Sequence, residues 1–312
     1  VDAARSKGPV LLVDSGNALF KTPGQDDPIL RRRAELILHA MGELGTAAMA
    51  VGERDLNAGL EYLKKTASKA RVPLLSANLR GADGELAFAP STVASVGSLR
   101  AGLIGVSPTS AGAGRPGIQV AAPVPAAIAA ARKLTGKVDI VIALAALPYA
   151  DALQLAKEAG SAIDLVLQSN ESRGPGSAQG SGESFVIPTG ERGRQVGRLE
   201  LDLSGSGPFV DKGQADRDRQ AIAFLDRQIL AAQKRSETAA SPEVKKNLAD
   251  ALRGFEARRQ ALAQDLASSP RKPGRTLELT YVPLGSEVGE DSRLKAQVEK
   301  LEPPGSVGEP EH

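Results

Sequence analysis

The stretch Gly8–Phe20, with the sequence GPVLLVDSGNALF, decides the fold. Its apolar run Val10–Val13 is followed directly by the small and polar residues 14–17. This pattern is typical of a buried parallel strand whose carboxyl end opens into a loop. In open α/β sheets, ligands bind at that end of the strands. We therefore expect Asp14 and Asn17 to face a ligand pocket, although a core strand followed by an ordinary turn would give the same pattern.

Five further segments that combine apolar residues with small or polar ones follow along the chain. They are residues 51–55 (VGERD), 73–79 (PLLSANL), 101–106 (AGLIGV), 139–144 (DIVIAL) and 164–171 (DLVLQSNE). Helical patterns separate several of them, and this alternation predicts an α/β fold. The polar residues at the strand ends give the full set of pocket candidates, which is Asp14, Asn17, Glu53, Arg54, Asp55, Asn78, Asn170 and Glu171.

The ordered set of segments resembles the catalytic domain of the 5'-nucleotidase branch of the calcineurin-like metallophosphoesterases. The resemblance covers roughly residues 8–204, and PLLSANL and AGLIGV contribute most to it. It implies an α/β (α+β) fold in which a calcineurin-like sandwich of two sheets is flanked by helices. In working members of the family, two metal ions lie at the strand ends.

The same comparison shows that the metal positions of this chain differ from the family pattern. The first motif, Asp-x-His on an earlier strand, has no counterpart. The second usually ends in Gly-Asp but ends here in Gly16-Asn17, and the third, Gly-Asn-His followed by Asp or Glu, reads GERD at 52–55. The fourth, a His after an apolar strand, falls near 145–147 (AAL), and the fifth, Gly-His-x-His, matches SNES at 169–172. Every matched metal position is altered.

The chain offers few side chains that bind transition metals. It has no cysteine and two histidines, His39 in a helical pattern and the terminal His312. A site with nitrogen or sulfur ligands therefore cannot be built within this chain. We expect no metal cofactor; the alternative is an all-oxygen Mg²⁺ or Ca²⁺ site formed by Asp14, Glu53 and Asp55.

Arg54 stands where the third family motif has its catalytic histidine. An arginine stays protonated and cannot transfer a proton, but it can bind a phosphate or carboxylate with two hydrogen bonds. The alternative for Arg54 is an ion pair with Glu53, Asp55 or Asp14.

Composition excludes some partners. Lys and Arg total 39 against 37 Asp and Glu, so the net charge of +2 gives no electrostatic indication of nucleic-acid binding. No apolar stretch is long enough to span a membrane. The sequence begins with Val1 and not with Met. Because the resembling family is mostly periplasmic or surface-anchored, we expect an exported protein whose signal peptide has been removed.

Residues 211–267 differ sharply in composition from the rest. They are rich in Ala, Gln and charged residues, and their apolar residues repeat at spacings of three and four. The repeating positions are Ile222, Leu225, Ile229 and Ala232, then Leu248, Leu252, Phe255, Leu262 and Leu266. This spacing predicts an antiparallel coiled-coil hairpin of two helices of about twenty residues each. Such a hairpin could dock a protein partner or mediate self-association, or it could be a rigid spacer.

The predicted domain organisation follows from these segments. The metallophosphoesterase-like domain takes 8–204 and 275–301, the helical hairpin is inserted at 211–267, and 302–312 form a disordered tail. Two antiparallel pairings are also expected, of Leu86–Phe88 with Thr92–Val96 and of Ser184–Thr189 with Gln195–Leu203.

Three functions remain open at this point. The first is a non-catalytic binding or scaffold module that has lost its metals, because without them the activated water and the charge stabilisation of phosphoryl transfer are both missing. The second is a metal-dependent phosphoesterase, acting on nucleotides or phosphomonoesters, with an oxygen-rich site. The third is a small-molecule binder in which Arg54 holds an anion.

Overall fold

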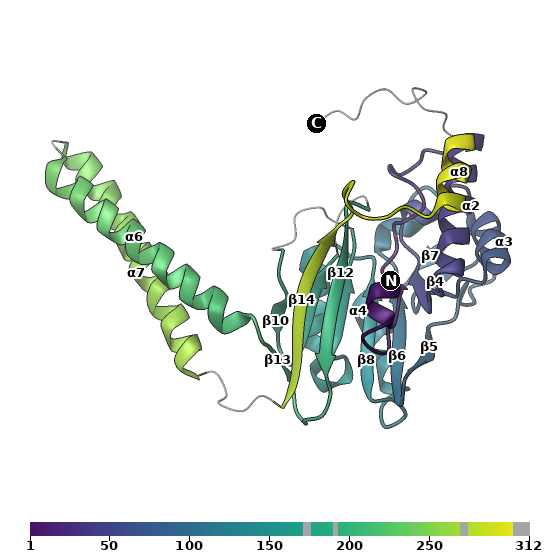
Figure 1. Ribbon diagram of the computed structural model, residues 1–312, viewed down its shortest axis with the longest axis horizontal. Coiled ribbons are helices and arrows are strands. Elements are labelled where there is room, and N and C mark those ends of the chain that lie inside the picture. The colour runs from purple at the N-terminus through teal and green to yellow at the C-terminus, as the bar shows by residue number, and fades with distance from the viewer. Residues whose placement is uncertain (171–175, 190–192, 240, 269–273, 302–312) are drawn as a thin grey trace. The chain divides into compact units, whose positions relative to one another are not determined.

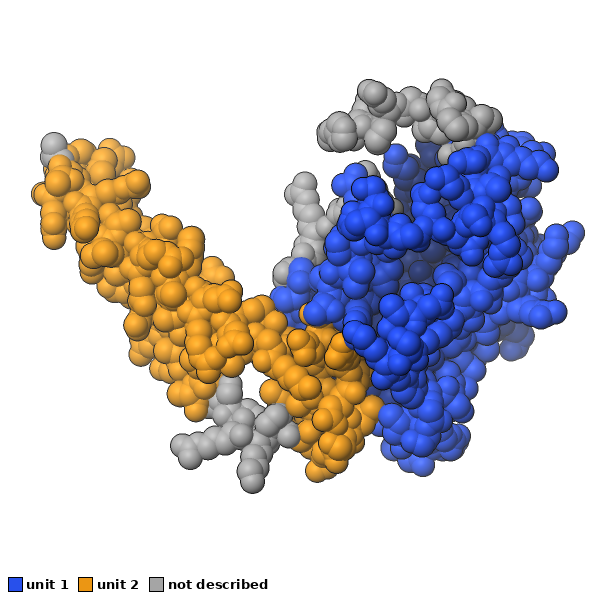
Figure 2. Space-filling model, in the orientation of Figure 1, with its two compact units in different colours: residues 1–198, 280–312 blue, residues 199–279 orange. Residues whose placement is uncertain are grey.

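The computed structural model describes residues 1–170, 176–189, 193–239, 241–268 and 274–301. The chain forms two compact units, one of Val1–Arg198 with Thr280–His312 and one of Leu199–Leu279 (Figure 2). Each unit is described by itself below. Glu171 and the predicted tail 302–312 lie outside the described residues.

The first unit contains two largely parallel sheets (Figure 1). One has three parallel strands, β1 (Val13–Asp14), β2 (Ala48–Ala50) and β3 (Leu74–Leu75), in that order. The other has the order β10-β11-β9-β8-β6-β5. Its parallel strands are β6 (Leu99–Val106), β8 (Ile140–Ala145), β9 (Leu165–Gln168) and β11 (Ser184–Pro188), and its antiparallel edges are β5 (Ser91–Val96) and β10 (Gln179–Ser181).

The two sheets pack closely on each other, and helices cover their outer faces. A Cβ on Gly105 of β6 would lie 2.1 Å from the Leu75 carbonyl oxygen of β3, so only glycine permits this approach. Helices α4 (Pro123–Arg132) and α5 (Tyr149–Ala159) share one core cluster with β8 and β9. Helices α2 (Pro28–Glu43) and α3 (Leu60–Ala70) share another with β2. The predicted sandwich of two sheets flanked by helices is confirmed.

Helix α2 shows how local sequence sets these elements. Asp27 precedes it, and its Oδ1 accepts the N–H groups of Ile29 at 2.8 Å and Leu30 at 2.9 Å. Pro28 occupies the first helical position, where its missing N–H costs nothing. Ala34 and Leu38 are buried on the side of the helix that packs on the core.

Two predicted strand pairings are wrong. Strand β5 pairs with β6, while Leu86 forms only an isolated bridge with Arg80. Strand β11 pairs with β9 and β10, and β12 (Gln195–Asp202) belongs to a different sheet. The two-residue strands β4 (Leu79–Arg80) and β7 (Gln119–Val120), which pair antiparallel, were not predicted, because two residues are too few to show a period.

A third sheet has the order β12-β14-β13, in which β14 is Arg275–Pro283. Strand β13 (Phe209–Asp211) runs parallel to β14, with Phe209 opposite Arg275. Between these two strands in sequence stand the helices α6 (Gln214–Thr238) and α7 (Pro242–Ser268).

Helices α6 and α7 have 25 and 27 residues, longer than predicted, and they lie side by side (Figure 1). Arg259 of α7 donates from Nε to Asp226 of α6 at 2.5 Å. Leu225 and Ala232 are buried on α6. The coiled-coil character of the pair stays a prediction.

Two short helices complete the fold, α1 (Asp2–Arg5) and α8 (Ser292–Leu301), and α8 lies next to α2. His39 is exposed on α2, in the helix that its sequence pattern predicted, and its Nε2 lies 3.6 Å from Glu43 Oε1. Among the described residues, no helix combines the length and the apolar character that a membrane span requires.

Candidate functional site

The carboxyl ends of β1, β2 and β9 meet in a compact group of loops, here called the strand-end cluster and defined as residues 14–19, 52–55 and Ser169. The chain enters it through two residues in the left-handed region, Gly16 with φ 89° and Asn17 with φ 63°. A Cβ on Gly16 would lie 2.7 Å from the Ala50 carbonyl oxygen. The first loop therefore packs directly on β2.

Asp55 lies at the centre of this cluster and is fully buried. Its Oδ2 accepts the N–H groups of Asn17 at 2.7 Å and Gly52 at 2.8 Å, and its Oδ1 accepts that of Leu19 at 3.1 Å. Burial raises the pKa of the Asp55 carboxyl, and these three N–H groups and the Arg54 charge oppose that shift. Asp55 thus joins the loops that follow β1 and β2, and both of its oxygens are used within the protein.

Asn17 joins three segments. Its Oδ1 accepts the backbone N–H of Arg54 at 3.1 Å, and its Nδ2 donates to the Ser169 carbonyl at 3.5 Å. A Cβ on Gly52 would lie 2.4 Å from Asn17 Oδ1, so glycine at position 52 makes room for this amide. Asn17 occupies the place where the resembling family has an aspartate, and here its side chain is directed into backbone contacts.

The Arg54 guanidinium binds two backbone carbonyls. Its Nη2 donates to Asn17 O at 2.9 Å and its Nη1 to Lys21 O at 3.0 Å, while Nε is buried without a partner. No carboxylate of the described residues lies within ion-pair distance of Arg54. The ion pair considered from the sequence is therefore absent there.

Asp14 ends strand β1 and is held more loosely. Its Oδ1 accepts the N–H of Gly16 at 2.7 Å. Burial raises the pKa of the Asp14 carboxyl to about 7, and the neighbouring Asp55 carboxylate adds to the shift, while the Gly16 N–H opposes it. Asp14 is thus a carboxyl group that changes its charge near neutral pH.

Glu53 faces a different element. Its Oε2 accepts a hydrogen bond of 2.6 Å from Ser110 Oγ, and Ser110 belongs to the short 3₁₀ helix η2 (Thr109–Gly112). The oxygens of Asp55 face backbone N–H groups, so Asp14, Glu53 and Asp55 do not form a cage of free carboxylates. No group of three or more His, Cys, Asp or Glu residues that could hold a metal occurs in the described part of the chain.

The Asn78 side chain is used to connect strands within the protein. It is fully buried, its Nδ2 donates to Ser107 O at 2.8 Å and to Ala121 O at 3.1 Å, and its Oδ1 accepts the Ser107 N–H at 2.9 Å. Ser107 Oγ in turn lies 2.6 Å from Val51 O and 2.8 Å from Ser76 Oγ. This network ties β6 to β2 and β3 and leaves Asn78 no free donor or acceptor for a ligand.

The structure thus unites Asp14, Asn17, Arg54 and Asp55, whereas Glu53 and Asn78 point to other partners. Asn170 is exposed and directly follows the cluster. Ser169 belongs to the cluster but was not predicted: its Oγ lies 2.6 Å from Ser15 O and 2.9 Å from Gly16 O. Its position directly after a buried strand is the sequence signal that would have found it.

No protein-family model and no curated protein matches the sequence. Solved structures do match. A 5'-nucleotidase precursor from Thermus thermophilus has a TM-score of 0.53 and 24% identity, over 64% of this chain and 43% of its own. The calcineurin-like phosphoesterase YfkN from Bacillus subtilis has a TM-score of 0.54 and 20% identity, over 64% of this chain and 73% of its own.

This chain has the metallophosphoesterase fold of the 5'-nucleotidases. The sulfate thiohydrolase SoxB of Thermus thermophilus shares this fold, with a TM-score of 0.55, 19% identity and coverage of 64% of this chain. The chain spans 43% of the nucleotidase precursor and 37% of SoxB, so it corresponds to less than half of either. At these identities the likeness establishes the metallophosphoesterase fold, and function has to be argued from the residues.

Proposed function

We propose that this protein is a non-catalytic binding module built on a metallophosphoesterase fold. The observation that supports this most directly is the use of Asp55. Its carboxylate, at the strand ends where the family binds cations, accepts the backbone N–H groups of Asn17, Leu19 and Gly52. A carboxylate engaged in this way holds loops together, and three of its roughly four acceptor positions are already used within the protein.

The chemistry of the fold supports the same proposal. A phosphoesterase with two metals uses them to generate a hydroxide nucleophile and to stabilise charge on the phosphoryl oxygens. Here Arg54, which cannot act as a proton donor and acceptor at neutral pH, stands at the position of the family histidine. The Arg54 guanidinium is bound to the carbonyls of Asn17 and Lys21.

The test is elemental analysis of the purified protein together with turnover of AMP and p-nitrophenyl phosphate in the presence of Mg²⁺, Mn²⁺, Ca²⁺ or Zn²⁺. We expect no stoichiometric metal and only background turnover. Turnover that a chelator abolishes would reject the proposal in favour of the metal-dependent phosphoesterase. A double variant, Asp14→Asn with Glu53→Gln, is the control, because activity that persists in it would belong to a contaminating phosphatase.

The helices α6 and α7 are proposed as the surface for a protein partner or for self-association. Phe224 and Leu230 on α6 are 53% and 54% exposed. Sedimentation velocity of the full chain over a range of concentrations tests self-association. We expect the sedimentation coefficient to rise with concentration, and the double variant Phe224→Ser with Leu230→Ser to remove this rise. A sedimentation coefficient that stays that of the monomer would reject self-association and leave the binding of a protein partner.

Export is proposed as well. It is supported by the likeness to a protein described as a 5'-nucleotidase precursor. Fractionation of the source cells with an antibody against this chain tests it, and recovery in the cytoplasmic fraction would reject it.

A second candidate function is the binding of a small anion by Arg54. It is supported by the absence of a carboxylate partner for Arg54 among the described residues and by its unpartnered Nε. In this case AMP or inorganic phosphate would raise the melting temperature of the protein, and Arg54→Ala would abolish the shift. Arg132→Ala, on the exposed end of α4, is the matched control. An unchanged shift in Arg54→Ala would reject Arg54 as the anion ligand.

A further inference from the structure

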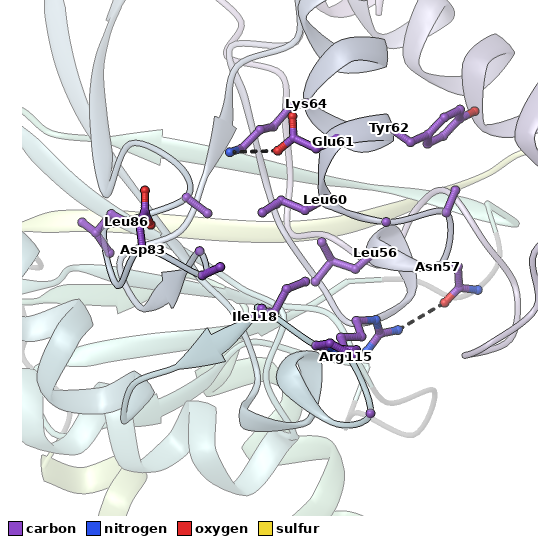
Figure 3. Close-up of a pocket in the computed structure, with 18 residues that line it drawn as sticks. Leu56, Asn57, Leu60, Glu61, Tyr62, Lys64, Asp83, Leu86, Arg115 and Ile118 are labelled. Atoms are coloured by element: carbon purple, nitrogen blue, oxygen red, sulfur yellow. Dashed lines mark hydrogen bonds and ion pairs between the residues drawn. The ribbon is translucent and has the colours of Figure 1, made fainter.

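A groove of about 750 Å³ begins at Leu56, directly after the strand-end cluster in sequence, and its lining residues are drawn in Figure 3. One wall is residues 56–64, from the 3₁₀ turn η1 (Arg54–Leu56) into helix α3, and the other is formed by residues 81–87 and 114–118. None of Asp14, Asn17 and Arg54 lines it. The groove is therefore a separate feature, and it is an open surface groove and not an enclosed cavity.

Apolar side chains form part of the groove's lining. Figure 3 shows Leu60 and Ile118 near its centre, and Leu86 stands on one rim with 37% of its surface exposed, whereas Leu56 is almost fully buried. The loop at Gly114 has a φ of 66°, and a Cβ at this position would meet nothing within 4 Å. The backbone is thus open to a ligand at this end of the groove.

Arg115 follows Gly114 and carries a charge that no carboxylate of the described residues balances. Its Nη2 donates to Glu53 O at 2.9 Å and to Asn57 Oδ1 at 3.4 Å, and its Nη1 donates to Ala111 O at 3.2 Å. Five N–H groups are available on a guanidinium. In the described part of the chain, Nε–H and one N–H of Nη1 have no partner, and no acidic side chain pairs with Arg115.

Asp83 carries the opposite charge on the other wall. It is exposed, and its Oδ1 accepts the N–H of Glu85 at 3.1 Å. No cation of the described residues pairs with it. The remaining charges of the groove, Lys64 and Glu61, lie 3.6 Å apart and balance each other. Within the described residues, the groove thus has one uncompensated cation, one uncompensated anion and a partly apolar lining.

We propose that this groove binds a short apolar peptide with free amino and carboxyl ends. The peptide carboxylate pairs with Arg115, where charge-assisted hydrogen bonds are the strong kind, and the ammonium group pairs with Asp83. Apolar side chains of the peptide cover Leu60, Leu86 and Ile118. A peptide supplies both charged ends together with several apolar side chains, whereas a single amino acid supplies only one side chain.

The test is isothermal titration calorimetry of the full chain with the tripeptide Ala-Leu-Leu, its C-terminal amide, its N-acetyl form and AMP. We expect the free tripeptide to bind, and the amide and the acetyl form each to bind about tenfold more weakly. In Arg115→Met, the affinity for the amide should be less than about twofold below that for the free peptide, because the group that reads the carboxylate is gone. In Asp83→Asn, the affinity for the acetyl form should likewise be less than about twofold below that for the free peptide, as expected for coupled groups. The matched controls are Arg132→Met and Glu85→Gln, which should behave like the wild type.

Three results would overturn the proposal. The first is the absence of binding heat for the free tripeptide. The second is a loss of affinity on amidation or acetylation that is the same in the variants as in the wild type. The third is binding of AMP without binding of the peptide. Because Arg115 also holds Glu53 and Asn57, Arg115→Met could disturb the loops. Asp83→Asn touches none of these contacts and keeps the oxygen that accepts the Glu85 N–H, so its result with the acetylated peptide decides the matter by itself.

Discussion

Gly52 in the strand-end cluster and Gly254 in helix α7 are both glycines, but the first is tightly surrounded and the second faces open space. A Cβ on Gly52 would lie 2.4 Å from Asn17 Oδ1 and 2.8 Å from the Asn17 nitrogen, whereas one on Gly254 would meet nothing within 4 Å. The first glycine is required by residues far away in sequence. The second is only a weak point in a helix. The difference shows that the cluster is specified by long-range contacts and the helical pair mainly by its own periodicity.

Substitution of Asp55 is the strongest test of this difference. Asp55→Ala leaves three buried N–H groups without an acceptor, and each such group costs about 1–3 kcal/mol. We expect a loss of about 4 kcal/mol or more in the free energy of unfolding, measured by urea titration. Hydrogen exchange should show the amides of Asn17, Leu19 and Gly52 losing protection. Asp139→Ala, at an exposed carboxylate, is the control, and an equal effect of the two variants would contradict the role of Asp55.

Titration of Asp14 is expected to have the next largest effect. Because the pKa of Asp14 is about 7 in the folded protein against 3.8 for the ordinary group, the folded state holds the proton more tightly between these values. The free energy of unfolding therefore falls as pH rises from about 4 to about 7. The full pKa shift corresponds to about 4 kcal/mol. We expect roughly 3 kcal/mol, because Asp14 keeps part of its surface accessible and solvent weakens the effect of burial. Asp55, whose pKa is also raised, adds a change of the same sign.

Asp14→Asn should remove most of this pH dependence, because the asparagine oxygen can still accept the Gly16 N–H. Urea unfolding at several pH values between 4 and 8 measures it, with Asp139→Asn as the control. An unchanged slope in Asp14→Asn would show that another group is responsible.

Gly52→Ala should cost about 2–3 kcal/mol, because the Asn17 amide and backbone must both move. The replacement Asn17→Ala in the same chain sharpens the test, since it removes one of the two clashing groups. We expect the double variant to be less destabilised than the sum of the single variants. Strict additivity in urea unfolding would show that Gly52 and Asn17 do not compete for this space.

Gly254→Ala should have the smallest effect and the opposite sign. Alanine in an exposed helix interior is about 0.5–1 kcal/mol more favourable than glycine, so the helices α6 and α7 should become more stable. Thermal unfolding followed by circular dichroism at 222 nm measures this, and Ala223→Gly in α6 is the converse control. A loss of stability in Gly254→Ala would mean that an unseen contact needs the glycine.

The sequence predicted the layers and the helices well because their signals are local. The Asp27-Pro28 start of α2 and the repeating apolar positions of α6 and α7 each fall within one element. The internal use of Asp55 and Asn17 could not be predicted in this way. Their partners are up to 152 residues away, as in the contact of Asn17 with Ser169. Arg115 was overlooked for the same reason, since its charge becomes notable only when the structure shows that no carboxylate of the described residues balances it.

The placement of α6 and α7 between two adjacent parallel strands has a consequence for how this protein can change. The register of Phe209 with Arg275 fixes where the inserted segment leaves and rejoins the sheet. Seven residues added to each helix would extend the pair by about 10 Å and would leave that register untouched. The two inserted helices can therefore be lengthened or shortened together, during evolution or by engineering, while the pairing of β13 with β14 stays the same.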